Sequence, residues 1–503
     1  IFFRKTMART ATFEPERMDS PEELNDKISQ LVRMISSSQH IIAFTGAGIS
    51  TSAGVPDFRG PEGKWTRQAK GLRPVTGVST LKAIPTRTHM AIMELLRRGV
   101  LKYLVSQNCD GLHRRSGVPA SSISELHGNS NVEECESCGQ QFFRDFACHR
   151  ESRGHDHGTG RGCTRCGRGR LLEWTIDFGQ QLPSRGLALA YRWAEQSDLC
   201  LALGSSLTVS PASDVPEIVA RKGRLVVVNL QPTPLTEQAA LHIYAPVDVV
   251  MDAVMTRLGL PVPPFRLRRR IAVAVRRLGD GETQLRVRGC DSEDPHLHVE
   301  NVRSVAWGPP AVDLRPLRTL AEQGPWWQPG DEVEVKGDDG RWHAAKVAQR
   351  QPNGDWTVSW ADERTPSCDV PTAFLRSKTL CKGLRVDTTQ PCAVPIRLSF
   401  FGHYNEPAVE LCSPVLGSED VEVVHTLEYD LTEGAWHLMS SERCGATDAS
   451  SGSTTPGNEY GQQHMQYVVE AWMKHKSWSR KHAMAIFEAY CERRRARLDF
   501  GPE

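Results

Sequence analysis

Four apolar runs constrain what this chain can fold into. Each is apolar at consecutive positions, as in strands that are buried on both faces. The runs are HIIAF (40–44), KYLVSQN (102–108), DLCLALGSS (198–206) and RLVVVNL (224–230). Segments with apolar residues at helical spacing accompany them, at 19–35, 85–99 and 247–259. The sequence therefore predicts an α/β fold built on a Rossmann-like parallel sheet for the first half of the chain.

The turn after the first run contains Gly46 and Gly48. Two glycines after a buried strand let backbone amides approach a phosphate at a helix N-terminus. Such a turn is equally typical of an ordinary tight connection. The third glycine of the dinucleotide fingerprint is replaced by Thr51, and no acid stands at a convincing spacing to hold a ribose. The pattern therefore indicates a nucleotide site and argues against a hydride-transferring Rossmann enzyme.

Polar residues follow the other predicted strands. Gln107, Asn108 and Asp110 come after KYLV, at the edge where parallel sheets bind ligands. His127 lies in ELHGN, and a lone histidine is usually structural. The metal-type cysteine pair that follows within ten residues favours a functional role here. The strands LGSSL and VVVNLQPT end in small polar residues suited to neutral hydrogen bonds with ribose and adenine: Ser205, Ser206, Asn229 and Gln231.

Two cysteine pairs, Cys135-x-x-Cys138 and Cys163-x-x-Cys166, predict a zinc site. Four thiolates close a tetrahedral site, and closed zinc sites are structural. A metal-free redox pair is the alternative. Second-choice ligands lie between the pairs: Cys148, His149, His155 and His157.

The opening IFFRKT is too short for a signal peptide, so the 14 cysteines indicate a reducing compartment.

Taken together, these stretches resemble one family, the sirtuins, which are Sir2-type NAD-dependent protein deacylases. The matching segments run in the family's order over roughly residues 19–260. They are GAGIST…GVPDFRGPEGKWT, SQNCDGLHRRSG, ELHGN, the cysteine pairs, LGSSLTVSPA and VVVNLQPTP. The segments PEGKWT, IPTRTHM, VEEC, LPSRGLALA and RLVVVNLQPT are most similar to class IV, the nuclear sirtuin-six and sirtuin-seven branch.

The resemblance implies NAD as co-substrate, one structural Zn²⁺ and a role for each site residue. His127 would act as general base on the ribose hydroxyls, and Asn108 and Asp110 would bind the nicotinamide carboxamide and the ribose. Phe58 and Arg59 would cover the reacting ribose. The residues implied to bind NAD are Gly46, Ala47, Gly48, Thr51, Phe58, Arg59, Trp65, Gln107, Gly204, Ser205, Ser206, Asn229, Gln231 and Val247.

In the second half of the chain, residues 326–363 resemble a Tudor or Agenet-type barrel. Asn353-Gly354 is a strong hairpin-turn signal. Such barrels hold methylated lysine or arginine in aromatic cages. Trp342, Trp356 and Trp360 are the candidate walls, and the acidic helper would be one of Asp338, Asp339 and Asp362. The alternative is that these tryptophans form the core of a small barrel.

The predicted organisation has six parts. These are a catalytic domain at 19–262 with the zinc module inserted at about 128–175, a β-rich segment at 263–320, the barrel at 321–380, a second β-rich segment at 381–445, a linker at 446–460 and a basic helical tail at 461–503. The basic runs 266–270 and 493–497 suit nuclear import, nucleic-acid binding or ordinary solvated faces.

Net charge is +1, so the whole molecule is not a polycation, and no apolar run is long enough for a membrane span. The favoured hypothesis is a nuclear protein-lysine deacylase that acts on histones and releases nicotinamide, free lysine and O-acyl-ADP-ribose. Two alternatives remain: a chromatin-binding scaffold with weak deacylase activity, and a protein mono-ADP-ribosyltransferase. The expected partners are acylated lysine, nucleosomes and, for the barrel, a methylated residue.

Overall fold

The computed structural model describes most of the chain up to residue 307 and separate parts beyond it. The described residues are 15–148, 157–177, 179–279, 282–294, 297, 299, 301–307, 332–336, 342–351, 356–360, 368–370, 375–377, 382–387, 393–415 and 420–444. They fall into two compact units. Unit 1 is built from the chain up to Asn129 and from Thr175–Pro264, and unit 2 from Ser130–Trp174 and from Phe265 to the last described residue, Cys444.

Unit 1 contains a six-stranded sheet in the order β10-β9-β8-β1-β2-β3, in which every pair is parallel. The strands are β1 Ile41–Thr45, β2 Leu101–Ser106, β3 Ile123–Glu125, β8 Leu199–Leu203, β9 Arg224–Val228 and β10 Leu241–Ile243. All residues of β1 and β8 are buried, as expected for strands covered on both faces. The four predicted strands are confirmed, with small shifts at their ends. The three-residue strands β3 and β10 are too short to leave a pattern in the sequence.

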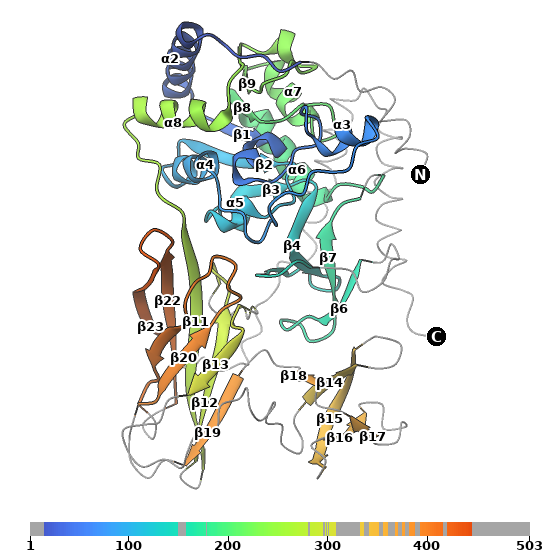
Figure 1. The fold of residues 1–503 in the computed structure, drawn as a ribbon, viewed down its shortest axis with the longest axis vertical. Helices are drawn as coiled ribbons and strands as arrows, with labels where there is room; N and C mark the ends of the chain where they lie inside the picture. Colours follow the sequence, from blue (N-terminus) through green and yellow to red (C-terminus); the bar gives the residue numbers. More distant parts are fainter. Residues whose placement is uncertain are drawn as a thin grey trace. The chain divides into compact units, whose positions relative to one another are not determined.

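Helices cover both faces of this sheet (Figure 1). Helices α2, α4 and α8 share one hydrophobic cluster with the strands, and α6 and α7 share the other. Helix α2 begins with a capping box, in which Ser20 and Glu23 exchange backbone-to-side-chain hydrogen bonds. The helices are α2 Pro21–Ser37, α3 Lys64–Ala69, α4 Arg87–Arg97, α5 Leu112–Arg115, α6 Ser184–Gln196, α7 Asp214–Ala220 and α8 Val247–Arg257, with 3-10 turns η1 Ala47–Ile49, η2 Thr51–Ala53, η3 Ala120–Ser122 and η4 Thr236–Gln238.

The cysteine-bearing part of unit 2 is a four-stranded sheet in the order β5-β4-β7-β6. Its strands are β4 Gly128–Cys135, β5 Gln141–Phe143, β6 Gly158–Gly162 and β7 Arg170–Thr175. A buried ionic cluster lies at its centre. The Glu133 carboxylate accepts hydrogen bonds from Arg144 Nε at 2.7 Å, Arg161 Nε at 2.6 Å and Thr159 Oγ1 at 2.6 Å.

The rest of unit 2 contains two sheets that share one hydrophobic core. The five-stranded sheet has the order β19-β12-β11-β22-β23 and the three-stranded sheet the order β13-β20-β21. Both segments predicted as β-rich therefore supply strands to a shared sheet. The strands are β11 Arg266–Gly279, β12 Glu282–Cys290, β13 Ser304–Trp307, β19 Lys382–Asp387, β20 Pro395–Ser399, β21 Val409–Cys412, β22 Val421–Asp430 and β23 Ala435–Cys444.

Between β13 and β19 the chain forms another sheet, in the order β17-β16-β15-β14-β18. All its pairs are antiparallel. The strands are β14 Glu332–Lys336, β15 Trp342–Arg350, β16 Trp356–Trp360, β17 Cys368–Val370 and β18 Leu375–Ser377. The predicted linker and basic helical tail lie outside the described residues, as does the basic run 493–497.

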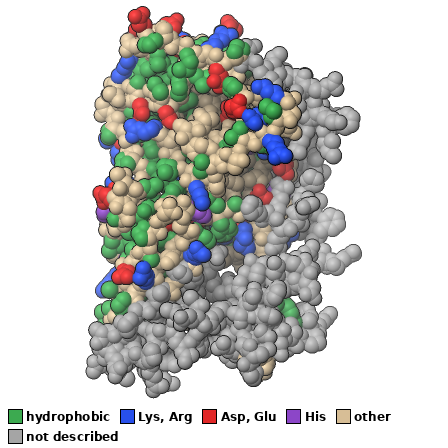
Figure 2. All heavy atoms as spheres, viewed as in Figure 1, with side chains coloured by type: hydrophobic (Ala, Val, Ile, Leu, Met, Phe, Trp, Pro, Cys, Tyr) green, Lys and Arg blue, Asp and Glu red, His purple; other side chains and the backbone are tan. Residues whose placement is uncertain are grey.

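The basic run 266–270 lies in β11, and acidic side chains on other segments pair with it. Arg266 contacts Asp430 at 2.5 Å and Arg268 contacts Glu428 at 2.5 Å, both across the strand pair. Arg269 is buried and pairs with Asp145 at 2.8 Å. These pairs make the run part of a charge-balanced sheet rather than a basic patch. On the face in Figure 2, basic and acidic side chains of the described residues are interspersed. No helix among the described residues is long and apolar enough to cross a membrane.

Candidate active site

The glycine turn after β1 packs against the loop after β8. A Cβ atom at Gly46 would lie 2.7 Å from the Gly204 carbonyl oxygen, and one at Gly48 would lie 2.8 Å from the Gly204 Cα. The Gly48 N–H donates to the Gly204 carbonyl at 2.8 Å. Gly204 itself has a φ of +59°, which favours glycine. The two loops can meet only because both lack side chains here, a packing role in addition to the predicted approach to a phosphate.

Asn108 and Asp110 are buried and hydrogen-bonded to the same turn. The Asn108 Nδ2 donates to the Gly46 carbonyl at 3.1 Å, and the Ser50 hydroxyl donates to Asp110 Oδ2 at 2.7 Å. The Leu112 N–H donates to the other Asp110 oxygen at 2.9 Å. The two polar residues predicted after β2 are therefore held at fixed positions beside the glycine turn.

His127 stands at the corner between β3 and β4. Its Nδ1 lies 2.9 Å from the Gln107 carbonyl oxygen, which can only accept a hydrogen bond. The proton of the neutral ring is therefore on Nδ1, and Nε2 carries a free lone pair. Burial lowers the pKa of His127, the Gln107 carbonyl opposes that shift, and the charge of Arg59 lowers the pKa further. The Gln107 side chain accepts a hydrogen bond from the Ser205 hydroxyl at 2.7 Å.

Phe58, Arg59 and Trp65 form an aromatic and cationic group beside the turn. The rings of Phe58 and Trp65 are 4.9 Å apart, and the Arg59 guanidinium lies 4.4 Å from the centre of the Trp65 ring. Asp57 shapes the loop, because its carboxylate accepts from the Gly60 N–H at 3.2 Å. Burial raises the pKa of the Asp57 carboxyl.

The remaining predicted cofactor residues lie at strand or helix ends of unit 1. Asn229 follows β9, and its Nδ2 donates to the Gln231 carbonyl at 2.8 Å. Ser206 hydrogen-bonds with Thr208 at 3.0 Å, and the Thr51 hydroxyl donates to the Gly48 carbonyl at 3.0 Å. Val247 begins α8 and is buried in the hydrophobic cluster.

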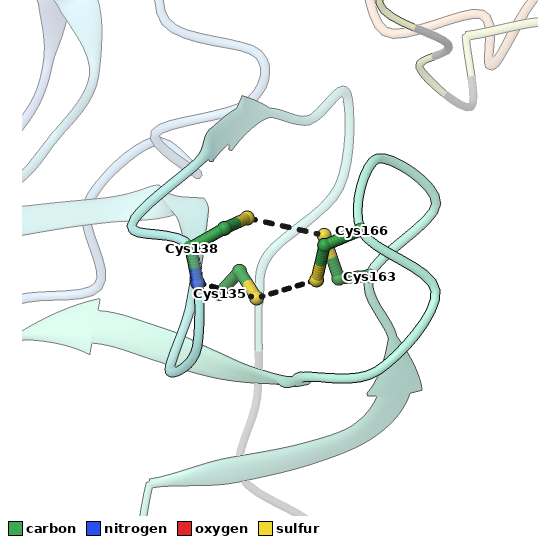
Figure 3. A group of neighbouring side chains, drawn as sticks. All are labelled: Cys135, Cys138, Cys163 and Cys166. Carbon is green, nitrogen blue, oxygen red and sulfur yellow. Dashed lines mark hydrogen bonds between the residues drawn. The ribbon is translucent and has the colours of Figure 1, made fainter. Parts of the chain in front are cut away.

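The four predicted cysteines form one cluster (Figure 3). Their sulfur atoms all lie within 4.8 Å of one another, and the pairs Cys135–Cys166 and Cys138–Cys163 are each 3.7 Å apart. Tetrahedral zinc with Zn–S bonds of about 2.3 Å requires sulfur separations of about 3.8 Å, so the cluster fits a structural zinc ion. A Cβ at Gly169 would lie 2.3 Å from the Cys135 sulfur.

Of the second-choice ligands, the described residues Cys148 and His157 are not part of this cluster. Among the described residues, the candidate metal group that contains these sulfurs has only the four predicted cysteines. Cys148 is buried and lies beside the ionic cluster of Glu133, where burial raises the pKa of its thiol to about 12. His149 and His155 lie outside the described residues. Four thiolates without histidine agree with the structural, closed type of site.

Comparison with known proteins identifies the family. A profile of the Sir2 family matches residues 75–211. The NAD-dependent protein deacetylase Sirt6 of Drosophila melanogaster is 40% identical over 260 residues, which are 50% of this chain and 81% of that protein. The chain belongs to the Sir2 family, the sirtuins. Human sirtuin-7, also named an NAD-dependent protein deacetylase, is 37% identical over 64% of this sirtuin and 80% of its own length.

Two other matches also cover about half of this chain. The NAD-dependent protein deacetylase SRT1 of Oryza sativa is 44% identical over 50% of this chain, and the match takes in 52% of the rice protein, about half its length. A solved Sir2 complex with a p53 peptide and NAD⁺ is 29% identical over 46% of this sirtuin and 98% of that chain, with a TM-score of 0.36.

Sequence reasoning missed three polar groups of unit 1, of which the first two are buried and the third, Asp248, is half-buried. Ser50 holds Asp110, as described above. Glu125 and Asn129, on either side of His127, bond to each other. Asp248 accepts hydrogen bonds from the Thr88 backbone and from the Ser52 hydroxyl. The only local signal for any of them is a polar residue inside an otherwise buried segment.

Proposed function

We propose that this sirtuin is an NAD-dependent protein-lysine deacylase. The observation that carries the proposal is the fixed His127 ring, whose Nε2 is left as a base by the Nδ1 bond to Gln107. Asn108 and Asp110 are held at the same edge of the parallel sheet, where such folds bind ligands. The names of the relatives support the same activity, since each is called an NAD-dependent protein deacetylase.

His127 moves the proton in this proposal. NAD supplies a ribose carbon with nicotinamide as leaving group, and the acyl-lysine oxygen attacks that carbon. After a ribose hydroxyl has attacked the acyl carbon, water adds there and the lysine amine leaves, so the acyl group ends on the ribose as O-acyl-ADP-ribose. The His127 Nε2 takes a proton from a ribose hydroxyl so that its oxygen can reach the acyl carbon. Burial and the charge of Arg59 both lower the pKa of His127, so the ring is the neutral base at neutral pH.

The other site residues would bind NAD and shield its reacting ribose. Asn108 and Asp110 would hold the nicotinamide amide and the ribose, and Ser205 would orient Gln107 toward the ribose hydroxyls. Gly46, Ala47, Gly48 and Thr51 would border the phosphates. Phe58, which is partly exposed, would cover the sugar face and keep water and nicotinamide away, with Arg59 and Trp65 as its support.

Mass spectrometry of the products tests the proposal. The purified chain is incubated with NAD and acetylated or myristoylated histone peptides, and then with nucleosomes. We expect nicotinamide, free lysine and O-acyl-ADP-ribose from the wild type and none from His127→Tyr. The matched control is His40→Tyr, because His40 is an exposed histidine that precedes β1, whereas the glycine turn follows that strand. Full activity in His127→Tyr would refute the assigned base.

The same experiment separates the two alternatives. ADP-ribose attached to protein, without O-acyl-ADP-ribose, would move the assignment to mono-ADP-ribosyl transfer. No NAD consumption on any substrate would favour the chromatin-binding scaffold. Histones as substrate and the nucleus as location are part of the proposal, supported by the resemblance to the nuclear branch of the family.

The barrel prediction has partial support. Five antiparallel strands, β14–β18, lie in the region of the predicted module, which supports a small β-domain there. Residues 358 and 360 share one face of β16, and Val358 on that face is fully buried. This favours a packing role at Trp360, which is half-buried. The side chains of Trp342 and Trp356 lie outside the described part, as do Asp338, Asp339 and Asp362, so the proposed function rests on unit 1 alone.

A further inference from the structure

Two buried polar side chains flank His127 in the chain. Glu125 is the last residue of β3 and Asn129 the second residue of β4, so they stand two positions before and after the histidine. The Asn129 Nδ2 donates a hydrogen bond of 2.6 Å to Glu125 Oε1. The exposed fractions of the residues are 0% for Asn129 and 4% for Glu125. This bond, the Glu125–Asn129 clasp, closes the corner that carries the proposed base.

The backbone on each side of the corner is also anchored. The Leu126 N–H donates to the Ser106 carbonyl at 2.9 Å, and the His127 carbonyl accepts from the Ile176 N–H at 3.1 Å. Gly128 has a φ of +76° and supplies the sharp turn. A left-handed glycine is the easiest point of such a corner to deform, and the clasp spans that point.

Glu125 also reaches the loop that carries Asp110. Its second oxygen, Oε2, lies 3.9 Å from Arg114 Nη1, and the Arg114 side chain is itself buried. Arg114 belongs to α5, which starts two residues after Asp110. One carboxylate thus links the corner of His127 to the helix behind the Asn108–Asp110 loop.

Joining two strands through a buried carboxyl group costs desolvation free energy. Burial raises the pKa of Glu125 to about 7, against the opposite effects of Arg114 and Asn129, and the charge of Asp110 adds to the increase. A well-packed apolar pair of similar volume would stabilise a fold at least as well. The polar pair supplies what an apolar pair lacks, which is a directional bond that fixes one conformation of the corner.

We infer that Glu125 and Asn129 are positioning residues for the proton transfer by His127, an inference that rests on the proposed function. The clasp fixes where the histidine backbone lies, and the Gln107 carbonyl fixes how its ring is rotated. A general base must come within about 2.6–3.2 Å of the proton that it takes. A displacement of about 1 Å can lower a rate about 10²-fold. The clasp therefore sets kcat, whereas NAD is bound by other residues.

The test compares Glu125→Ala, Glu125→Gln, Asn129→Ala and the double alanine variant of the full chain. Steady-state kinetics with NAD and an acetylated peptide give kcat and the KM for NAD. We expect each alanine variant to lower kcat by about 10- to 100-fold with KM changed less than about threefold. The double variant should be no slower than Glu125→Ala, because that variant already removes the hydrogen bond to Asn129. Glu125→Gln should restore kcat to within about threefold, since its amide oxygen still accepts from Asn129.

Hydrogen exchange gives a readout that does not need turnover. In the alanine variants the backbone amides of residues 123–129 should exchange faster, while those of β1 keep their protection. If Glu125→Ala fails to fold, the result for Asn129→Ala decides whether the inference holds. A rise in KM at constant kcat, or a Glu125→Gln variant as slow as Glu125→Ala, would overturn the inference. A wild type without NAD turnover would overturn the proposed function instead. Unchanged exchange of residues 123–129 in Asn129→Ala would overturn the clasp itself.

Discussion

Acid should destabilise unit 1 through two histidines that its core keeps neutral. His89 and His113 are 0% and 2% exposed, with ring centres 4.7 Å apart. The Thr86 N–H donates to His89 Nδ1 at 3.2 Å, and the Thr86 hydroxyl donates at 3.0 Å to the carbonyl of Ile49 in η1, the 3-10 turn that contains Gly48. His113 Nε2 hydrogen-bonds with the hydroxyl of Thr45, the last residue of β1, at 2.9 Å. The two buried histidines therefore help to hold the backbone of the glycine turn after β1 in place.

The magnitude follows from the pKa of His89. Burial lowers that pKa from 6.5 to about 3, against an opposing effect of the Asp248 charge. The unfolded chain takes up a proton near pH 6.5 and the folded chain does not. The stability is therefore complete above pH 6.5 and is lost as the pH falls below it. At pH 5 the interval of 1.5 units, at about 1.4 kcal/mol per unit, corresponds to about 2 kcal/mol. His113, whose pKa burial also lowers, adds a loss of the same sign.

The assay compares the wild type with His89→Asn. Asparagine keeps an acceptor for the Thr86 N–H and does not titrate. Amide hydrogen exchange in β1, corrected for intrinsic rates, gives the free energy of opening at pH 7.5 and pH 5. We expect the wild type to lose about 2 kcal/mol more than the variant over this interval. Equal losses in the two proteins would refute the reasoning, because His89 would then be charged or absent from the core. Each protein is compared with itself, so the smaller side chain does not affect the result.

Three further predictions concern the metal and the packing. The purified chain should hold a single zinc ion, and Cys138→Ser should remove it and expose the cluster core at Phe142, as measured by metal analysis and limited proteolysis. Glu133→Ala leaves the buried Arg144 and the half-buried Arg161 without their carboxylate, and should lower the free energy of unfolding of unit 2 by about 3–5 kcal/mol in denaturant titrations. Gly48→Ala should lower the melting temperature and weaken NAD binding at least about tenfold by calorimetry, because the added carbon would lie 2.8 Å from the Gly204 backbone. Unchanged NAD affinity would show that this turn does not border the cofactor.

The sheet of unit 1 and the zinc cluster could be predicted because their signals are local. A fully buried strand such as β1 is apolar at nearly every position, and the helices of unit 1 include one with a cap at Ser20. The cysteine pairs are recognisable from their spacing alone. Polar residues at strand ends were expected to converge because parallel strands end at one edge, and Asn108 and Gln107 do meet the glycine turn and Ser205 there.

Pairings between distant segments could not be predicted. The clasp partners of His127 are ordinary polar residues until β3 and β4 form the corner. Ser50 and Asp110 are 60 residues apart in sequence. The basic run 266–270 suggests a patch when taken alone, and only the register of β11 with β22 shows that Glu428 and Asp430 stand opposite Arg268 and Arg266. Tertiary pairing of this kind leaves no trace in a window of neighbouring residues.

The five-stranded sheet of unit 2 joins strands that are far apart in the sequence, and this has a consequence for synthesis on the ribosome. Strand β11 must pair with β22, and Arg268 and Glu428 in these strands are separated by 160 residues. At about 5–20 residues per second, the ribosome needs roughly 8–30 s to make that length. The strands β14–β18 emerge and can pair among themselves during this time, while one edge of β11 stays without its partner. An open strand edge is a template for other chains. During that interval the newly made protein therefore presents one edge of β11, a strand that contains the buried Ile271 and Val273, to pairing with other chains.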